Sequence, residues 1–191
     1  MASRAGLDRA RVLQAAAELA DAEGPEGLAL GTLAERLGIR TPSLYHYVAG
    51  LPGLQRELAL MANRMLGERL ARAAIGKARD EAVVALADAF RGFIKEHPGL
   101  YALTVRSALR VGAPDDEMRR AQQEALSVLT AVAASYHLDG AEAIHAIRGL
   151  RSIGHGFATL EAAGGFGIAL DLDESYHCLV RMYLAGLQPA G

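Results

Sequence analysis

Apolar residues recur along most of the chain at spacings of three and four residues, the period of one face of an α-helix. Ala, Leu, Arg and Glu, which favour helices, dominate the composition. No segment alternates apolar and polar residues as a strand does. Glycine and proline divide the pattern into about nine predicted helices, at about 8–23, 32–37, 42–48, 52–74, 80–97, from 98, 116–136, 141–163 and 174–187. The chain is therefore predicted to be all-α.

The two short segments at 32–37 and 42–48 form the most specific pattern. They are joined by Gly38-Ile39-Arg40, and a tight turn that contains glycine is typical of a helix-turn-helix. Small and apolar residues on both segments would form a miniature core, in which Ala34 allows the two helices to approach closely. The second helix would then fit the major groove of DNA. An ordinary helical hairpin with a polar outer face is the alternative.

The second short helix carries polar and aromatic residues on its outer side. Thr41 is placed to cap this helix, with Pro42 at its first position, where proline loses no hydrogen bond. Hydroxyl groups near a helix N-terminus suit phosphate contacts. The residues predicted to point outward are Arg40, Thr41, Ser43, Tyr45 and His46.

The run from Leu33 to Val48 resembles the DNA-binding motif of TetR-type transcriptional repressors, and so do 11–16 and the stop at 23–24. The stretches 97–101 and 155–161 resemble the WHG-type C-terminal effector domain of that family, although the tryptophan of that name is missing. The resemblance implies a homodimer that binds a palindromic DNA operator and is released by a small-molecule effector. It also implies a helix-turn-helix domain at 1–50, followed by a helical effector-binding and dimerisation domain at 51–191. The helix at 52–74 joins the two and is the expected lever.

Carried onto this chain, the family's DNA-contacting positions are Arg40, Thr41, Pro42, Ser43, Tyr45, His46 and Tyr47. Three departures qualify the match. Ala29 stands where the family often has a capping threonine, and Leu51 stands where it usually has a phosphate-binding lysine. In addition, eight basic groups within residues 1–70 are balanced by eight acidic ones. We expect weak non-specific affinity and a shallow salt dependence, partly compensated by Arg4 and Arg56.

Two stripes in the last two predicted helices suit contact with another helix. One holds small and apolar residues, and the other forms a wide apolar face. They predict a four-helix dimer interface, with the completion of the subunit core as the alternative. The predicted interface residues are Gly149, Ile153, Gly156 and Leu160 on one helix and Tyr176, Leu179, Val180, Tyr183 and Leu184 on the other.

A ligand pocket between helices is predicted from apolar side chains with polar groups near them in the pattern. The candidate ligand-binding residues are Phe90, Phe93, Tyr101, Thr104, Arg151, His155 and Thr159. Aromatic residues at helical spacing also fill cores. Arg151 and His155 could bind an acidic ligand, or they could pair with Glu161.

Composition excludes several other classes of protein. The 191 residues are 51% hydrophobic with a formal charge of −2, and the one cysteine, Cys178, excludes a disulfide framework. The six histidines show no metal-binding spacing, and no nucleophile–base pair suggests an enzyme. No cofactor, metal or membrane segment is expected, and the location is expected to be cytoplasmic. A helical small-molecule carrier or enzyme and a protein–protein adaptor stay as rival hypotheses.

Overall fold

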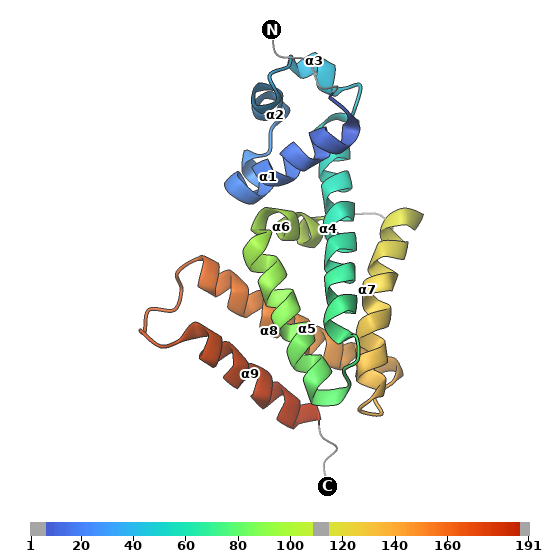
Figure 1. The fold of residues 1–191 in the computed structure, drawn as a ribbon, viewed down its shortest axis with the longest axis vertical. Coiled ribbons are helices and arrows are strands. Elements are labelled where there is room, and N and C mark those ends of the chain that lie inside the picture. The colour runs from blue at the N-terminus through green and yellow to red at the C-terminus, as the bar shows by residue number, and fades with distance from the viewer. Residues whose placement is uncertain (1–6, 109–114, 188–191) are drawn as a thin grey trace. The chain divides into compact units, whose positions relative to one another are not determined.

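A computed structural model describes residues 7–108 and 115–187, and these ranges hold helices and no strand (Figure 1). The prediction of an all-α fold is confirmed. The helices are α1 (Arg9–Gly27), α2 (Leu30–Leu37), α3 (Thr41–Leu44), α4 (Gly50–Ala74), α5 (Arg79–Glu96), α6 (Pro98–Ala108), α7 (Asp116–Ala134), α8 (Gly140–Ala162) and α9 (Leu172–Leu187). Arg4 and the predicted break at 112–114 lie outside the described residues. Within these ranges, no helix combines the length and the apolar character that crossing a membrane requires.

The chain divides into two compact units that do not follow its order. The N-terminal unit comprises residues 1–63 and 97–115, and the C-terminal unit comprises 64–96 and 116–191. Helix α4 is therefore continuous through the division, and α6 groups with α1–α3 although it follows α5 in sequence. The predicted boundary after residue 50 separates a DNA-binding domain from an effector-binding domain. A division into compact units does not test such functional domains, so this boundary stays a prediction.

Helix α1 begins and ends for local reasons. Asp8 caps its N-terminus, because the side-chain carboxylate accepts a hydrogen bond from the Arg11 amide at 2.8 Å. Gly24 interrupts the helix with a positive φ of 75°, a conformation that glycine adopts without strain. Pro25 follows and opens one further turn, which ends at Gly27. The predicted stop at 23–24 is thus a kink rather than the end of the element.

Helix α6 is fastened to α1 inside the N-terminal unit. A Cβ atom at Gly99 would overlap the carbonyl oxygen of Ala20, so only glycine allows this approach. The Asp21 carboxylate accepts a hydrogen bond from the Leu100 amide at 2.9 Å and lies 2.8 Å from Nδ1 of His97. These bonds, together with the close approach, fix the start of α6 against α1.

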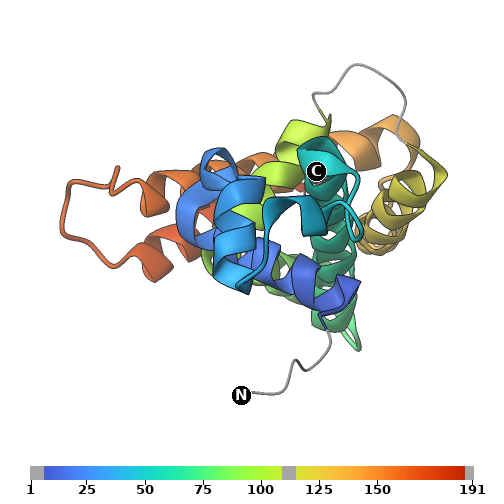
Figure 2. The same cartoon turned by 90° about the horizontal axis from the view of Figure 1, so that it is seen from above.

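The C-terminal unit is built around α5, which packs against α7, α8 and α9. Phe93 is 1% exposed and Tyr176 is fully buried, with its hydroxyl donating to the Ala87 carbonyl at 2.8 Å. A Cβ at Gly154 would overlap the Phe90 ring, so α8 lies very close to α5. Helices α8 and α9 run side by side and are joined by the loop at 163–171 (Figures 1 and 2).

A part-buried ion-pair network, centred on the buried Arg91, links α5 to both of these helices. The Arg91 guanidinium makes two hydrogen bonds of 2.9 Å to the Glu161 carboxylate and lies 2.8 Å from Asp173. Lys95 donates to the same Glu161 at 2.7 Å. The Arg91 side chain is 8% exposed and lies over the ring of Tyr176. Hydrogen bonds from Arg91 and Lys95 lower the pKa of Glu161, because they stabilise its charged form.

Candidate DNA-binding site

The turn between α2 and α3 is set by the end of α2. Gly38 takes a left-handed conformation at φ 66°, and its amide donates to the Glu35 carbonyl at 3.0 Å. The Ile39 amide donates to the Ala34 carbonyl at 3.0 Å. This pair of bonds closes the helix in the Schellman pattern, which favours glycine at the left-handed position. The predicted turn at Gly38 therefore follows from one residue with a specific backbone conformation.

The predicted miniature core is present behind this turn. Leu33 and Leu44 are fully buried, and Ala34 and Val48 are 2% and 4% exposed. The burial of Ala34, a small residue between two short helices, agrees with the close approach expected there. These side chains hold α2 and α3 in a fixed geometry, which leaves the outer side of α3 available for a partner.

Helix α3 is shorter than predicted and begins one residue earlier. It spans Thr41–Leu44, and residues 45–47 continue as a turn. Arg40, whose backbone is extended, holds the N-cap position, and no side chain caps the helix. The expectation that Thr41 is the cap is therefore wrong, because the backbone becomes helical at Thr41 itself. Pro42 does lie in the first turn, where its missing N–H leaves no bond unmade.

The predicted DNA contacts divide by exposure. Arg40, Pro42, Tyr45 and His46 are exposed, and the Tyr45 side chain is 62% exposed despite its apolar ring. Thr41 and Ser43 are half-buried beside them. Helix α3 and the residues that flank it therefore bring together one cation, two exposed rings and two half-buried hydroxyls.

Tyr47 has a different position from its neighbours. It is half-buried, and its hydroxyl donates to the Leu7 carbonyl at 3.0 Å. This bond attaches the chain just before α1 to the turn that follows α3. Tyr47 thus fixes Leu7 against this turn, and a DNA contact by the same side chain stays a prediction.

Ion pairs occupy four of the six arginines described in the N-terminal unit, including Arg106, which pairs with Glu26. Arg9 pairs with Glu57 at 2.8 Å, Arg36 with Glu18 at 3.0 Å, and Arg56 with Asp115 at 2.6 Å. The compensation expected of Arg56 is therefore reduced, since its guanidinium already has a carboxylate partner. Among the described residues no carboxylate pairs with Arg40, which makes it an available cation at this surface.

Ala29 and Leu51 occupy the positions expected of them. Ala29 is the N-cap of α2 and makes no side-chain cap hydrogen bond, so one stabilising contact is missing at that helix start. Leu51 lies half-buried in the first turn of α4, directly after Gly50 with its positive φ of 69°. Both departures thus fall on helix starts beside α3.

The predicted ligand residues do not gather in one place. Phe90 and Phe93 are buried in the core of the C-terminal unit, whereas Tyr101 and Thr104 are buried in the N-terminal unit. The Thr104 hydroxyl donates to the Tyr101 carbonyl at 2.7 Å, which satisfies it locally. The remaining three, Arg151, His155 and Thr159, lie on the exposed side of α8. Their role in ligand binding stays a prediction.

The predicted dimer residues also separate by exposure. Tyr176, Val180 and Leu184 are at most 8% exposed, so their own chain already covers them and they complete the subunit core. Tyr183 is half-buried, and its hydroxyl donates to the Ala146 carbonyl at 2.6 Å. Gly149, Ile153, Gly156 and Leu179 are half-buried, and Leu160 is 50% exposed. In the described ranges, no three His, Cys, Asp or Glu side chains gather as metal ligands would.

Comparison with known proteins relates this arrangement to other chains. Residues 83–183 match the family described as tetracyclin repressor-like, C-terminal domain. The chain is 35% identical to the uncharacterized HTH-type transcriptional regulator YobS of Bacillus subtilis, over 98% of this chain and 96% of that protein. It is 34% identical to the uncharacterized HTH-type transcriptional regulator Rv0681 of Mycobacterium tuberculosis, over 98% and 85%.

Solved structures share the fold. SCO7222, a TetR transcriptional regulator from Streptomyces coelicolor, superposes with a TM-score of 0.71 at 20% identity, over 95% of this chain and 98% of that one. A single-substitution variant of TetR from Acinetobacter baumannii, in complex with minocycline, gives 0.68 at 21%, over 95% and 96%. The assignment to the WHG subgroup stays a prediction. By its family match and its relatives, this chain belongs to the TetR family of DNA-binding transcriptional regulators, which are not enzymes.

Proposed function

We propose that the chain is a repressor that binds a palindromic operator as a homodimer and leaves it when a small-molecule effector binds. The observation that carries the DNA-binding part is the exposed end of the N-terminal unit. Arg40 has no carboxylate partner among the described residues there, and Tyr45 and His46 are exposed beside it. Exposed rings and a cation on a rigid helical turn are suited to a groove of DNA.

Each residue of this surface has a chemical role in the proposal. Arg40 is long enough to bond a guanine edge or a phosphate, and Tyr45 and His46 can donate to either. The hydroxyls of Thr41 and Ser43 are suited to phosphate oxygens. The Pro42 ring can contact a thymine methyl group. Tyr47 supports them, since its bond to the Leu7 carbonyl holds the residue before α1 against the turn after α3.

The proposed homodimer uses the outer face of α8 and α9. Gly156 and Gly186 lie inside these helices, and a Cβ at either would meet no atom of its own chain within 4 Å. Glycine costs a helix about 1 kcal/mol relative to alanine, so packing within the subunit does not account for it. Close approach of a second subunit does, and the exposed Leu160 and Met182 would be buried with it.

The dimer also meets the geometric requirement of a palindrome. Two recognition segments must reach successive major grooves, which lie about 34 Å apart. A two-fold dimer presents the same surface twice, so an inverted repeat is the expected operator. The retained interface residues are Gly149, Ile153, Gly156, Leu160, Leu179 and Tyr183, together with Met182 and Gly186.

Effector release requires a ligand that prefers a protein conformation poorly matched to DNA. The A. baumannii TetR variant was solved with minocycline, which supports a small-molecule effector for this chain. Two helices can transmit the change. Helix α4 runs without interruption through both units, and α6 follows α5 and is bonded to α1 through Asp21. A difference of about 5.5 kcal/mol between the two states would give nearly complete release.

Selection of bound sequences from a random DNA pool tests the proposal. The expected product is an inverted repeat whose half-sites are one helical turn apart. Arg40→Ala should weaken operator binding by about 1–3 kcal/mol, whereas Arg120→Ala, an exposed arginine on α7, should leave it unchanged. If no inverted repeat is enriched, a carrier or an adaptor is favoured instead. The same holds if the Arg40→Ala and Tyr45→Ala variants bind DNA as tightly as the wild type.

A further inference from the structure

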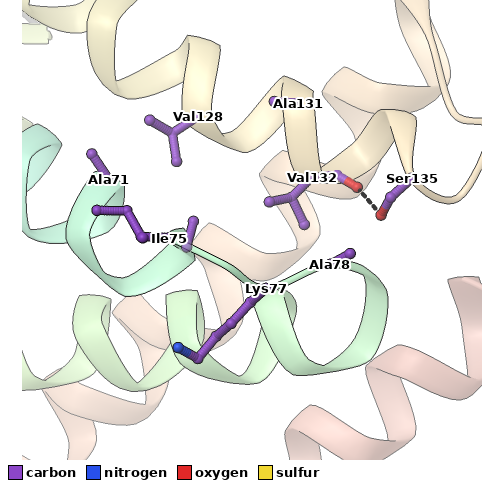
Figure 3. A pocket seen from close by; sticks show the side chains of 9 residues that line it. Ala71, Ile75, Lys77, Ala78, Val128, Ala131, Val132 and Ser135 are labelled. Carbon is purple, nitrogen blue, oxygen red and sulfur yellow. Dashed lines mark hydrogen bonds between the residues drawn. The ribbon is translucent and has the colours of Figure 1, made fainter.

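A groove opens in the C-terminal unit between the end of α4, the turn to α5 and the last turns of α7 (Figure 3). Its volume is about 330 Å³, within the range of small-molecule sites. The lining is almost wholly aliphatic and contains no aromatic ring. The residues that form it are Ala71, Ala74, Ile75, Lys77, Ala78, Val128, Ala131, Val132 and Ser135.

Most polar groups around this groove bond to one another. The Arg79 amide donates to Ser135 Oγ at 3.1 Å, and its guanidinium donates to the Ser135 carbonyl at 2.9 Å. The Ser135 hydroxyl donates to the Val132 carbonyl at 2.7 Å, as the dashed line in Figure 3 marks. The Tyr136 hydroxyl donates to Asp80 at 2.6 Å. These bonds fasten the start of α5 to the turn that follows α7, and they leave none of these side chains available for a ligand without rearrangement.

Lys77 differs from these groups. In the part of the chain that the structure describes, no carboxylate pairs with it, although it lines the groove. Figure 3 shows its side chain leading away from the α7 residues, so its ammonium is not among the aliphatic side chains. The groove therefore offers aliphatic walls and a single positive charge.

We propose that this groove binds an aliphatic carboxylate, with the chain against the Ala, Ile and Val walls and the carboxylate paired with Lys77. An apolar chain loses contact with water in the groove, and a single anionic group is what one cation at this site selects. An aromatic or highly polar ligand would find neither a stacking ring nor an available hydrogen-bonding group. The residues proposed earlier for ligand binding form no part of this site.

The site also suggests how its occupant would act, and this step rests on the proposed effector release. Ala71 and Ala74 belong to the last turn of α4. The first turn of α4 begins at Gly50, shortly after α3 and the proposed DNA-contacting residues. Arg79, the first residue of α5, holds a left-handed backbone with φ at 48°, and four residues separate it from the end of α4. A ligand wedged between the end of α4 and α7 would favour one position of α4, and the helix would carry that preference along its length.

Methyl NMR of the full-length protein, titrated with decanoate below its micelle concentration, tests the site. Saturable shifts are expected at the methyl groups of Ile75, Val128 and Val132. Ala131→Leu, which fills the groove from an exposed position, should abolish them. Ala134→Leu, the matched control on the same helix, should leave them unchanged. Lys77→Gln should weaken decanoate binding about tenfold, which corresponds to about 1.4 kcal/mol. Lys77→Arg, which keeps the positive charge, should restore it.

Other outcomes overturn the inference. Absence of saturable shifts at these methyl groups, equal binding of decyltrimethylammonium, or unchanged binding by Ala131→Leu would each exclude a built carboxylate site. The effector role is tested separately, by adding decanoate to the complex with a selected operator. Release of the wild type but not of Ala131→Leu is expected. If decanoate fills the groove without releasing DNA, the effector role is wrong while the repressor stands. If no operator exists, the proposed function fails.

Discussion

The two units differ in what they leave exposed. Of the large hydrophobic side chains exposed in the described ranges, only Tyr45 belongs to the N-terminal unit. The other six, Ile75, Leu126, Leu160, Ile168, Leu170 and Met182, belong to the C-terminal unit. The N-terminal unit therefore buries its aliphatic residues within itself and offers polar groups to a partner. The C-terminal unit leaves aliphatic surface uncovered, as expected of a part that meets another subunit or an apolar ligand.

Two contacts, one in each unit, hold helices together in different ways. Close backbone approach at Gly99 fixes α6 to α1 in the N-terminal unit. In the C-terminal unit, the charges of Arg91 and Glu161 join α5 to α8. Each unit has both kinds of contact, since Asp21 also bonds α6 to α1 and Gly154 also lets α8 approach α5 closely. The Gly99 contact itself depends on shape and the Arg91 network on charge, so these two contacts should respond differently to substitution and to pH.

The largest expected effect is at the part-buried ion-pair network. Arg91→Ala should lower the free energy of unfolding by about 3 kcal/mol, because it removes two charged hydrogen bonds from the part-buried Glu161 carboxylate and leaves it with only Lys95 as its partner. Urea denaturation followed by circular dichroism measures this change. Arg64→Ala, which removes the half-exposed pair with Glu117, should cost no more than about 1 kcal/mol. Equal effects would mean that the network is no stronger than a surface pair.

The close approach of α6 to α1 gives the next effect. Gly99→Ala should destabilise the protein by about 1–3 kcal/mol, since the new methyl group overlaps the Ala20 carbonyl and the helices must separate. Thermal unfolding at several scan rates measures it. Gly31→Ala is the control, because its Cβ would meet nothing within 4 Å on α2. A Gly99→Ala protein as stable as the wild type would show that α6 is free to move off α1.

Introducing charged residues on the exposed face of α8 and α9 should weaken the proposed dimer. Leu160→Glu combined with Met182→Glu should weaken self-association at least tenfold, or about 1.4 kcal/mol, because four carboxylates would meet in one interface. Sedimentation should then show a 20.2 kDa species. Glu142→Lys, on α8 outside this stripe, serves as the charge control. A wild-type protein that sediments as a monomer would contradict the proposed dimer.

Lowering the pH should weaken the ion pair between Arg91 and Glu161. The folded-state pKa of Glu161 lies below its ordinary value, mainly because Arg91 bonds its charged form. Its contribution to stability is therefore complete above the unfolded pKa, about 4.3, and is lost as the pH falls through the folded pKa. Glu161→Gln should flatten the fall of unfolding free energy on acidification, measured by urea titrations at several pH values. The same slope in both proteins would contradict the assignment.

The smallest effect concerns salt and the N-terminal unit. Because its arginines are mostly paired, few phosphates can be neutralised, and affinity for random DNA should fall only gently with salt. Glu57→Gln frees Arg9 to neutralise one more phosphate. The plot of log affinity against log salt concentration should then become steeper by about 0.9. A mobility-shift series in potassium chloride measures both. A steep slope for the wild type would show that the ion pairs open on DNA.

Sequence reasoning succeeded where the determining contacts are local. The turn at Gly38 and the burial of Leu33 and Leu44 follow from residues at most eleven positions apart. Helix periodicity and glycine chemistry act over such distances, so the all-α fold and the helix-turn-helix could be predicted. The start of α3 was displaced by one residue, which is typical of helix ends.

Tertiary structure decided which side of each later helix is the core. In the sequence, the stripes of α8 and α9 both suited contact with another helix, yet Tyr176 and Val180 are buried within the subunit while Leu160 stays exposed. The attachment of α6 to α1 and the groove beside Lys77 likewise depend on residues more than forty positions apart. Periodicity shows that a helix has an apolar face but not what covers it, because that depends on packing between distant segments.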